Sequence, residues 1–189
     1  MIMKNIPDEK IVAQVQKGDK DAYAEIVDRY EKPLRAYAMR ITANPDAIED
    51  IVQEAFIKAY RDIQSFDTKR KFSSWIYRIV HNESINHIRK NKNLVPLDET
   101  VEIADEKNLS KEIEQKIDSK KDFERLNLAL ESLENKYREV VYLRFFQEKD
   151  YEEIAEILRM PIGTVGTLLN RGKAKLKLEY QKRANEVNR

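Results

Sequence analysis

A short break between two helical patterns, at residues 159–161, constrains the fold of this chain more than any other feature. Asp150 is followed three residues later by Glu153, the spacing of a capping box that begins a helix. Ala155 is followed by a break four residues later and by Val165 ten residues later, which is the spacing of a helix-turn-helix. The second helix then carries small or apolar residues on its inner stripe: Val165, Leu169, Gly172 and Leu176. We therefore predict two helices that cross at close range.

The opposite face of this second helix suits DNA. At about 100° per residue, it carries short polar groups and cations: Thr167, Asn170, Arg171, Ala174 and Lys177. Short polar side chains can read base edges in the major groove, and cations can contact phosphates. The alternative is an ordinary helical hairpin, whose solvated face is usually also polar.

The rest of the chain also favours helices. With four glycines and five prolines in 189 residues, there is little turn chemistry for a many-stranded sheet. Helical periodicity fails only between residues 93 and 121, where acidic residues dominate. We predict an all-α protein with two small helical domains, residues 1–92 and 122–189, joined by a flexible acidic linker, residues 93–121. The second domain contains the helix-turn-helix.

Local start signals divide the first domain. We predict four helices before residue 64. The first begins at Asp8 and ends at Gly18, and the second begins at Asp19 or Asp21 and runs through Tyr30. The third begins at Pro33, and the fourth begins with a capping box of Asp46 and Glu49 and runs to about Ile63. A polar loop, residues 64–71, precedes a fifth helix that starts near Ser73.

The stretch from Lys69 to Lys90 combines positive charge with aromatic rings. It holds six lysines and arginines against one acidic residue, and Phe72, Trp75 and Tyr77 lie among them. Cations neutralise phosphates without reading sequence, while aromatic faces stack on bases that have left a duplex. The stretch is a candidate for holding opened nucleic acid. The alternative is that the rings pack in the core, and for Trp75 we expect mainly packing.

The predicted helix from Asp46 has an unusual outer face. Opposite its apolar stripe lie Asp50, Gln53, Glu54, Ile57 and Arg61. An isoleucine among carboxylates suits a protein partner with basic residues around an apolar contact. A solvated helix with one stray apolar residue is also common, and the pattern alone favours that alternative.

The composition argues against several classes of protein. The chain has no cysteine, so disulfides, thiolate catalysis and cysteine-based zinc sites are excluded. Its two histidines, His81 and His87, lack the spacing of a zinc pair, and no phosphate-binding glycine loop or nucleophile–base arrangement is present. We therefore predict no enzyme activity, no cofactor and no metal site. No apolar run has membrane-spanning length and no signal peptide is recognisable, so we expect a cytoplasmic protein without membrane insertion.

Taken in order, five stretches resemble segments of the extracytoplasmic-function sigma factors, the small two-domain promoter-recognition subunits of bacterial RNA polymerase. Residues 18–30, GDKDAYAEIVDRY, resemble the start of their first domain. Residues 46–67, DAIEDIVQEAFIKAYRDIQSFD, resemble the segment that docks on polymerase. Residues 70–90, RKFSSWIYRIVHNESINHIRK, resemble the segment that opens and reads the −10 element. Residues 130–146 and 150–176 resemble the −35-binding domain, and the resemblance covers roughly residues 8–180.

The resemblance implies a sigma factor whose partners are core RNA polymerase, promoter DNA and an anti-sigma factor. It implies contacts to a basic coiled coil of the polymerase from Asp50, Gln53, Glu54, Ile57 and Arg61. It implies −10 contacts, including capture of a flipped base by the loop 65–71, from Ser65, Phe66, Asp67, Lys69, Arg70, Lys71, Phe72, Arg78, Asn82 and Arg89. For the −35 element it implies Thr164, Thr167, Asn170, Arg171, Lys173 and Lys177. The acidic linker would lie in the polymerase's RNA channel.

Some positions depart from the family pattern. Gly166 and Leu168 stand where a cation is usual, Arg159 replaces a turn glycine, and Glu83 occupies a position that is usually apolar. Weakened −35 recognition would follow from the lost cations. The alternative to a sigma factor is a two-domain helix-turn-helix regulator that never binds polymerase. That alternative leaves the basic-aromatic stretch and the Ile57 face without a role.

Overall fold

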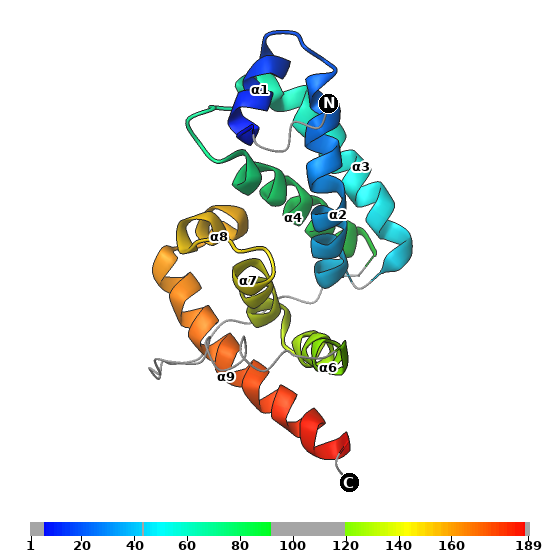
Figure 1. Ribbon diagram of the computed structural model, residues 1–189, viewed down its shortest axis with the longest axis vertical. Helices are drawn as coiled ribbons and strands as arrows, with labels where there is room; N and C mark the ends of the chain where they lie inside the picture. The colour runs from blue at the N-terminus through cyan, green and yellow to red at the C-terminus, as the bar shows by residue number, and fades with distance from the viewer. Residues whose placement is uncertain (1–5, 43, 92–119, 188–189) are drawn as a thin grey trace. The chain divides into compact units, whose positions relative to one another are not determined.

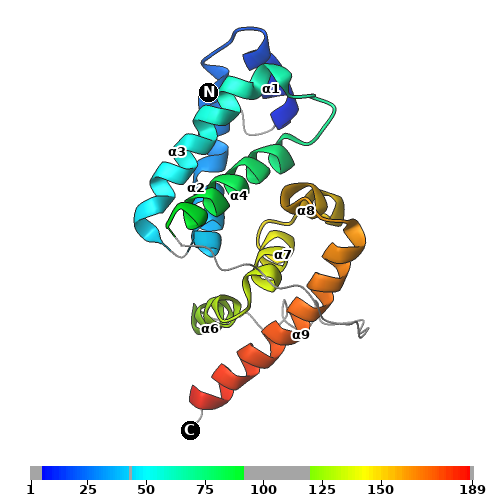
Figure 2. The ribbon, with the colours of Figure 1, turned by 180° about the vertical axis from the view of Figure 1, so that it is seen from behind.

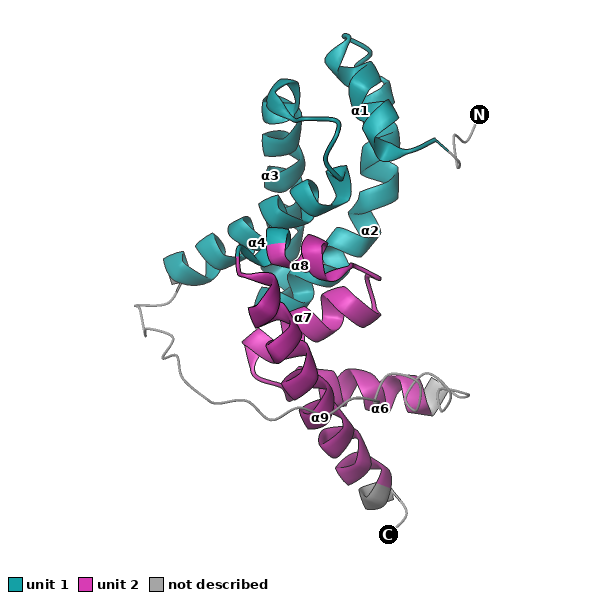
Figure 3. Cartoon of the chain, turned by 90° about the vertical axis from the view of Figure 1, so that its left-hand side faces the viewer, with its two compact units in different colours: residues 1–96, 156–159 teal, residues 97–155, 160–189 magenta. Residues whose placement is uncertain are grey.

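The computed structural model of the chain describes residues 6–42, 44–91 and 120–187. Every regular element within these ranges is a helix, so the predicted all-α class is confirmed (Figure 1). The chain divides into two compact units, residues 1–96 with 156–159 and residues 97–155 with 160–189 (Figure 3). The predicted linker, residues 93–121, lies outside the described residues except for residues 120–121, which begin helix α6. None of the described helices combines the length and the apolar character needed to span a bilayer.

The first unit is built from α1 (Asp8–Gln16), α2 (Ala22–Thr42), α3 (Pro45–Asp62), the 3-10 turn η1 (Ile63–Ser65) and α4 (Phe72–Asn91). Helices α2, α3 and α4 pack on one another in every pairing, and α1 packs against α2 and α4 (Figures 1 and 2). The core is the set of apolar stripes that these helices turn toward one another, including Leu34, Tyr37, Ile51, Ala55, Ile76 and Val80.

Helix α2 corrects one prediction. A helix ending at Tyr30 and another beginning at Pro33 are in fact one helix, with Pro33 inside it. A proline in a helix interior costs about 3 kcal/mol. The buried stripe nevertheless continues through this point, from Ile26 and Tyr30 to Leu34 and Tyr37. Each fully buried apolar side chain contributes about 1.5–3 kcal/mol, so burial on both sides of Pro33 outweighs its cost.

The helix starts of the first unit agree only in part with the predictions. Of the two residues predicted to begin α2, Asp19 or Asp21, Asp19 accepts a hydrogen bond at 3.2 Å from the N–H of Ala22, the first residue of the helix. Helix α3 begins two residues earlier than expected, because Asn44, not Asp46, is its cap and accepts a hydrogen bond from the Asp46 N–H. Asp8 lies inside the first turn of α1 rather than before it, and Pro7 occupies the cap position.

The second unit contains α6 (Lys120–Glu131), α7 (Asn135–Phe145), α8 (Tyr151–Leu158) and α9 (Ile162–Val187). The capping box is confirmed in both directions: the Glu153 N–H donates to Asp150 Oδ1 at 2.7 Å, and the Asp150 N–H donates to Glu153 Oε2 at 3.0 Å. In α8 the most buried positions are Ile154 and Ile157, whereas Tyr151 is exposed. Helix α8 is continuous to Leu158, although the division into units groups residues 156–159 with the first unit.

The α8–α9 turn has the geometry that a helix-turn-helix needs. Arg159 adopts a φ of 52°, in the left-handed region where glycine is favoured. The inner stripe of α9 is buried as predicted, at Val165, Leu169, Gly172 and Leu176. A Cβ atom on Gly172 would lie 2.7 Å from Val141 Cγ2 and 3.4 Å from the Tyr137 carbonyl oxygen. The absent side chain therefore lets α9 lie close against α7.

Candidate nucleic-acid interfaces and partner surface

The segment that links α3 to α4, residues 63–71, is called the α4 loop below. Asp67 organises its tip: Oδ1 accepts a hydrogen bond from the Lys69 N–H at 3.0 Å, and its carbonyl oxygen accepts one from the Arg70 N–H at 2.9 Å. This is an Asx-type turn, in which a side chain replaces a backbone partner. The side chains of Lys69, Arg70 and Lys71 are exposed. The tip thus presents successive cations on a tight turn.

Both ends of the α4 loop are bonded to α1. Gln16 Nε2 donates to the carbonyl oxygens of Ile63 and Phe66, each at 2.8 Å. Glu9 Oε1 accepts a hydrogen bond from the N–H of Phe72, the first residue of α4, at 2.9 Å. The sequence gives no local sign of these contacts, because the partners lie 47, 50 and 63 positions apart.

An aromatic cluster lies beneath the α4 loop. The ring of Phe66 lies 5.5 Å from that of Phe72 and 5.0 Å from that of Trp75, measured between centroids. Phe72 is fully buried and Phe66 is 7% exposed. Both were predicted to contact DNA, and the structure places them in the core instead, where edge-to-face rings stabilise the base of the loop. Trp75 is half-buried in the same cluster, in line with the expectation of packing.

Helix α4 carries the remaining −10 candidates. Arg78, Asn82 and Arg89 fall within a narrow sector of the helix, since they are spaced by four and seven residues. Ser65 is exposed at the end of η1. Within the first unit, the loop tip, Ser65 and this sector of α4 thus hold the predicted −10 set except the two buried phenylalanines.

The outer face of α3 is defined by Asp50, Gln53, Glu54, Ile57 and Arg61, and every one of these residues is exposed. Ile57 is 61% exposed, while the stripe on the other side of the helix, from Ile48 to Ala59, is buried. Arg61 pairs with Asp62 at 3.2 Å, so its positive charge is partly offset locally. The outer face is therefore an acidic rim around one apolar side chain.

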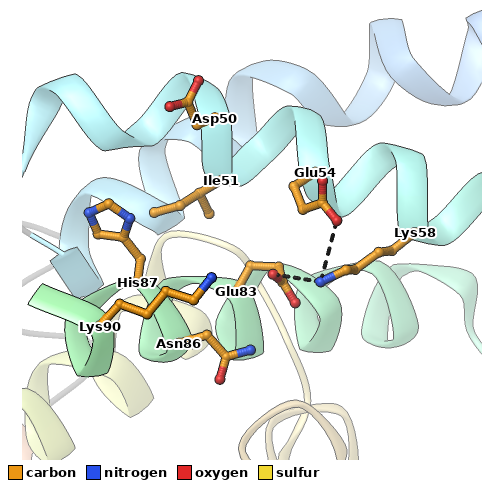
Figure 4. Close-up of a pocket in the computed structure, with 8 residues that line it drawn as sticks. All are labelled: Asp50, Ile51, Glu54, Lys58, Glu83, Asn86, His87 and Lys90. Atoms are coloured by element: carbon orange, nitrogen blue, oxygen red, sulfur yellow. Dashed lines mark ion pairs between the residues drawn. The ribbon is translucent and has the colours of Figure 1, made fainter.

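A groove of about 450 Å³ separates α3 from α4 beside this face (Figure 4). Lys58 spans it, 2.8 Å from Glu83 and 3.4 Å from Glu54. The hydrogen bond to the Glu83 carboxylate raises the pKa of Lys58 above its usual value. The ion pair accounts for a glutamate at a position that is usually apolar. Charged residues of both signs line the groove, namely Asp50, Glu54, Lys58, Glu83 and Lys90, together with Ile51, Asn86 and His87.

Helix α9 of the second unit presents the −35 candidates. Thr164 is exposed, and Thr167, Asn170, Lys173 and Lys177 are half-buried. The Thr167 hydroxyl donates to the Gly163 carbonyl oxygen at 2.9 Å, which leaves it an acceptor for a DNA group.

Three other positions on α9 bear on this surface. Arg171 Nη2 is buried, so part of the Arg171 guanidinium faces the protein. A Cβ atom on Gly166 would lie 3.7 Å from Tyr151 Cε2, an ordinary contact, so packing does not require glycine there. Leu168 is half-buried and belongs partly to the core.

The chain thus combines a helix-turn-helix unit with a second helical unit that carries a cationic loop, and the family models identify these units as regions of a sigma-70-class promoter-recognition protein. Sigma-70 region 2 matches residues 26–94, and Sigma-70 region 4 matches residues 123–176. The chain is 39% identical over 179 residues to the ECF RNA polymerase sigma factor SigW of Bacillus subtilis (strain 168), covering 91% of this chain and 96% of the relative. It is 32% identical over 186 residues to the ECF RNA polymerase sigma-E factor of Escherichia coli (strain K12), covering 90% and 92%.

The chain therefore belongs to the family of extracytoplasmic-function sigma factors. It is a transcription initiation factor that binds core RNA polymerase and recognises −10 and −35 promoter elements.

Solved structures show the same fold. A structure of CnrH in complex with the cytosolic domain of CnrY superposes with a TM-score of 0.66 at 22% identity, covering 90% of this chain and 95% of that one. The sigma factor RpoE in complex with the anti-sigma factor NepR from Bartonella quintana gives a TM-score of 0.63 at 22% identity, covering 84% and 96%.

Proposed function

We propose that the two units divide promoter recognition between them. Residues 1–92 would bind polymerase and the −10 element, residues 122–189 would bind the −35 element, and residues 93–121 would be the linker that joins them. The region 2 match, residues 26–94, falls in the first proposed domain except for its last two residues, and the region 4 match, residues 123–176, lies within the second. The protein would act in the cytoplasm, where promoter DNA and polymerase are found.

The outer face of α3 is the proposed polymerase contact. The observation that carries this proposal is the 61% exposure of Ile57 at the centre of an acidic rim. Burial of an exposed apolar side chain by a partner lowers the free energy of the complex, and the surrounding carboxylates favour a basic partner. A basic coiled coil, as implied by the resemblance, meets both requirements.

The α4 loop is the proposed site of −10 base capture. Cations at Lys69, Arg70 and Lys71 attract phosphates of single and double strands alike, so they cannot distinguish opened DNA. A pocket for an extruded base can, since unstacking a base costs a few kcal/mol that the pocket must offset. The exposed polar groups at Ser65 and Asp67 stand where such a pocket would form, and Arg78, Asn82 and Arg89 would hold the adjoining duplex.

The exposed part of α9 is the proposed −35 reader. Asn170 would contact a base edge, and Thr164, Thr167, Lys173 and Lys177 would contact base edges or phosphates. Arg171 would contribute less than a fully exposed arginine, since one of its guanidinium nitrogens is buried. With Gly166 and Leu168 in place of cations, we propose a comparatively weak −35 contact.

We also propose control by an anti-sigma factor. One structurally similar protein is described in complex with an anti-sigma factor, NepR. The exposed apolar side chain on α3 is a surface that such an inhibitor could cover in competition with polymerase.

Transcription in vitro with core polymerase and a library of random promoters tests the proposed function. We expect transcripts from templates that share both a −10 and a −35 sequence. A two-domain regulator that never binds polymerase would bind duplex DNA in this experiment but would yield no transcript. That result would overturn the proposal.

A further inference from the structure

We propose that Gln16 and Glu9, on one face of α1, are positioning residues that hold the α4 loop in its base-capturing shape. The inference rests on the proposed function of the loop. It adds a role for α1, which lies before the segment that the region 2 model matches, residues 26–94.

The two residues lie on the same face of α1. They are seven positions apart, which is about two helical turns and about 10 Å along the axis. Gln16 binds the carbonyl oxygens at the beginning of the loop, and Glu9 binds the N–H that follows its end. Residues 67–71 therefore run between two backbone positions, at Phe66 and Phe72, that are both hydrogen-bonded to α1.

The chemistry of each contact suits this role. The amide of Gln16 has two hydrogens, and it gives one to each of two carbonyl oxygens at 2.8 Å. The Phe72 N–H is at the first residue of α4, where backbone donors lack an intrahelical partner. The Glu9 carboxylate supplies that partner and carries the charge that a helix N-terminus favours.

Helix α1 is itself fixed to the unit. Asp8 accepts hydrogen bonds from Arg29, at 2.8 Å, and from the Tyr30 hydroxyl. Ile11, Val12 and Val15 are buried against the core. A frame of this kind matters for base capture, because a binding pocket on a loop loses affinity when the loop must first be ordered.

The test uses the full chain with core polymerase. Gln16→Met keeps the length of the side chain and removes both donors, and Glu9→Ala removes the acceptor. Gln14→Met is the matched control, since Gln14 lies on the same helix and its Oε1 has no hydrogen-bond partner among the described residues. Opening is followed by the fluorescence of 2-aminopurine placed in the −10 element, and circular dichroism checks the fold of each variant.

We expect Gln16→Met and Glu9→Ala each to slow opening about tenfold, while polymerase affinity and −35 duplex affinity stay within twofold of the wild type. Glu9→Gln keeps an acceptor oxygen and should restore most of the opening rate. Opening by both variants at the rate of the Gln14→Met control would overturn the inference. If the wild type itself fails to open the promoter, the proposed function of the loop fails instead. Should Gln16→Met not fold, the Glu9→Ala and Glu9→Gln pair decides the matter alone.

Discussion

Lys58 on α3 and Glu83 on α4 form an ion pair of 2.8 Å that joins the helix with the acidic outer face to the helix with the basic-aromatic stretch. Their side chains are 29% and 15% exposed, so the pair is shielded from water more than a surface ion pair. Lys58 also reaches Glu54, a member of the outer face, at 3.4 Å. Lys58 therefore connects a carboxylate of the outer face to a carboxylate on α4 through its two ion pairs.

A double-mutant cycle with Lys58→Met and Glu83→Gln measures this pair. We expect a coupling energy of about 0.5–1 kcal/mol in urea unfolding at neutral pH. Because the folded-state pKa of Lys58 is raised, this contribution is present below the ordinary lysine pKa and is lost as pH rises through the raised value. Strictly additive effects of the two changes would show that the pair contributes nothing.

Ile57→Glu tests the outer face of α3. The change adds a charge to an exposed position, so the fold should be retained while polymerase affinity falls at least tenfold. Ile57→Met is the control, because it preserves apolar area, and it should bind within threefold of the wild type. Titration of labelled core polymerase gives both affinities. Equal binding by the two variants would remove this face from the polymerase interface.

Replacement of residues 67–69 with Gly-Ser-Gly tests the α4 loop while it leaves Phe66 in the core. We expect polymerase binding and −35 duplex binding to be unchanged and promoter opening to be lost. Permanganate reactivity of thymines near the start site reports opening. If the variant still opens promoters, the first unit only clamps duplex DNA.

Asn170→Ala and Lys177→Ala separate base reading from phosphate contact on α9. Asn170→Ala should relax the preference at one base position by about 1–3 kcal/mol. Lys177→Ala should weaken binding to all sequences alike and reduce the slope of log affinity against log salt by about one. Binding to a set of −35 variants at several salt concentrations distinguishes the two. Identical behaviour of the variants would mean that the helix faces DNA differently.

Gly172→Ala tests the close approach of α9 to α7. The added Cβ would lie 2.7 Å from Val141 Cγ2, so we expect a loss of about 1–3 kcal/mol from the stability of the second unit. Gly163→Ala is the control: nothing lies within 4 Å of its Cβ position, and it should stabilise by up to about 1 kcal/mol through helix propensity. Thermal unfolding of both variants, followed by circular dichroism, checks the contrast.

The sequence predicts the local features of this protein well. The capping box of Asp150 and Glu153 and the buried stripe from Val165 to Leu176 depend on neighbours a few residues apart, and both are confirmed. Pro33 misled the prediction, because helix signals are local while the burial that keeps α2 continuous involves α3 and α4.

The candidate site is predicted less completely, and the reason is again distance along the chain. Phe66 and Phe72 have the composition of a nucleic-acid surface, yet three-dimensional packing turns both rings inward. Gln16 and Glu9 carry no motif at all. Their contacts to the α4 loop form only when α1 folds back on a segment some fifty or more residues later.

The aromatic cluster beneath the α4 loop has a practical consequence. Trp75 is the only tryptophan of the chain, and its ring lies 5.0 Å from that of Phe66, at the beginning of the loop tip. The tryptophan emission of the protein therefore originates next to the proposed site of base capture. A single-stranded −10 oligonucleotide that enters the loop would perturb this emission without any label, so the native chain is its own optical sensor of the binding event.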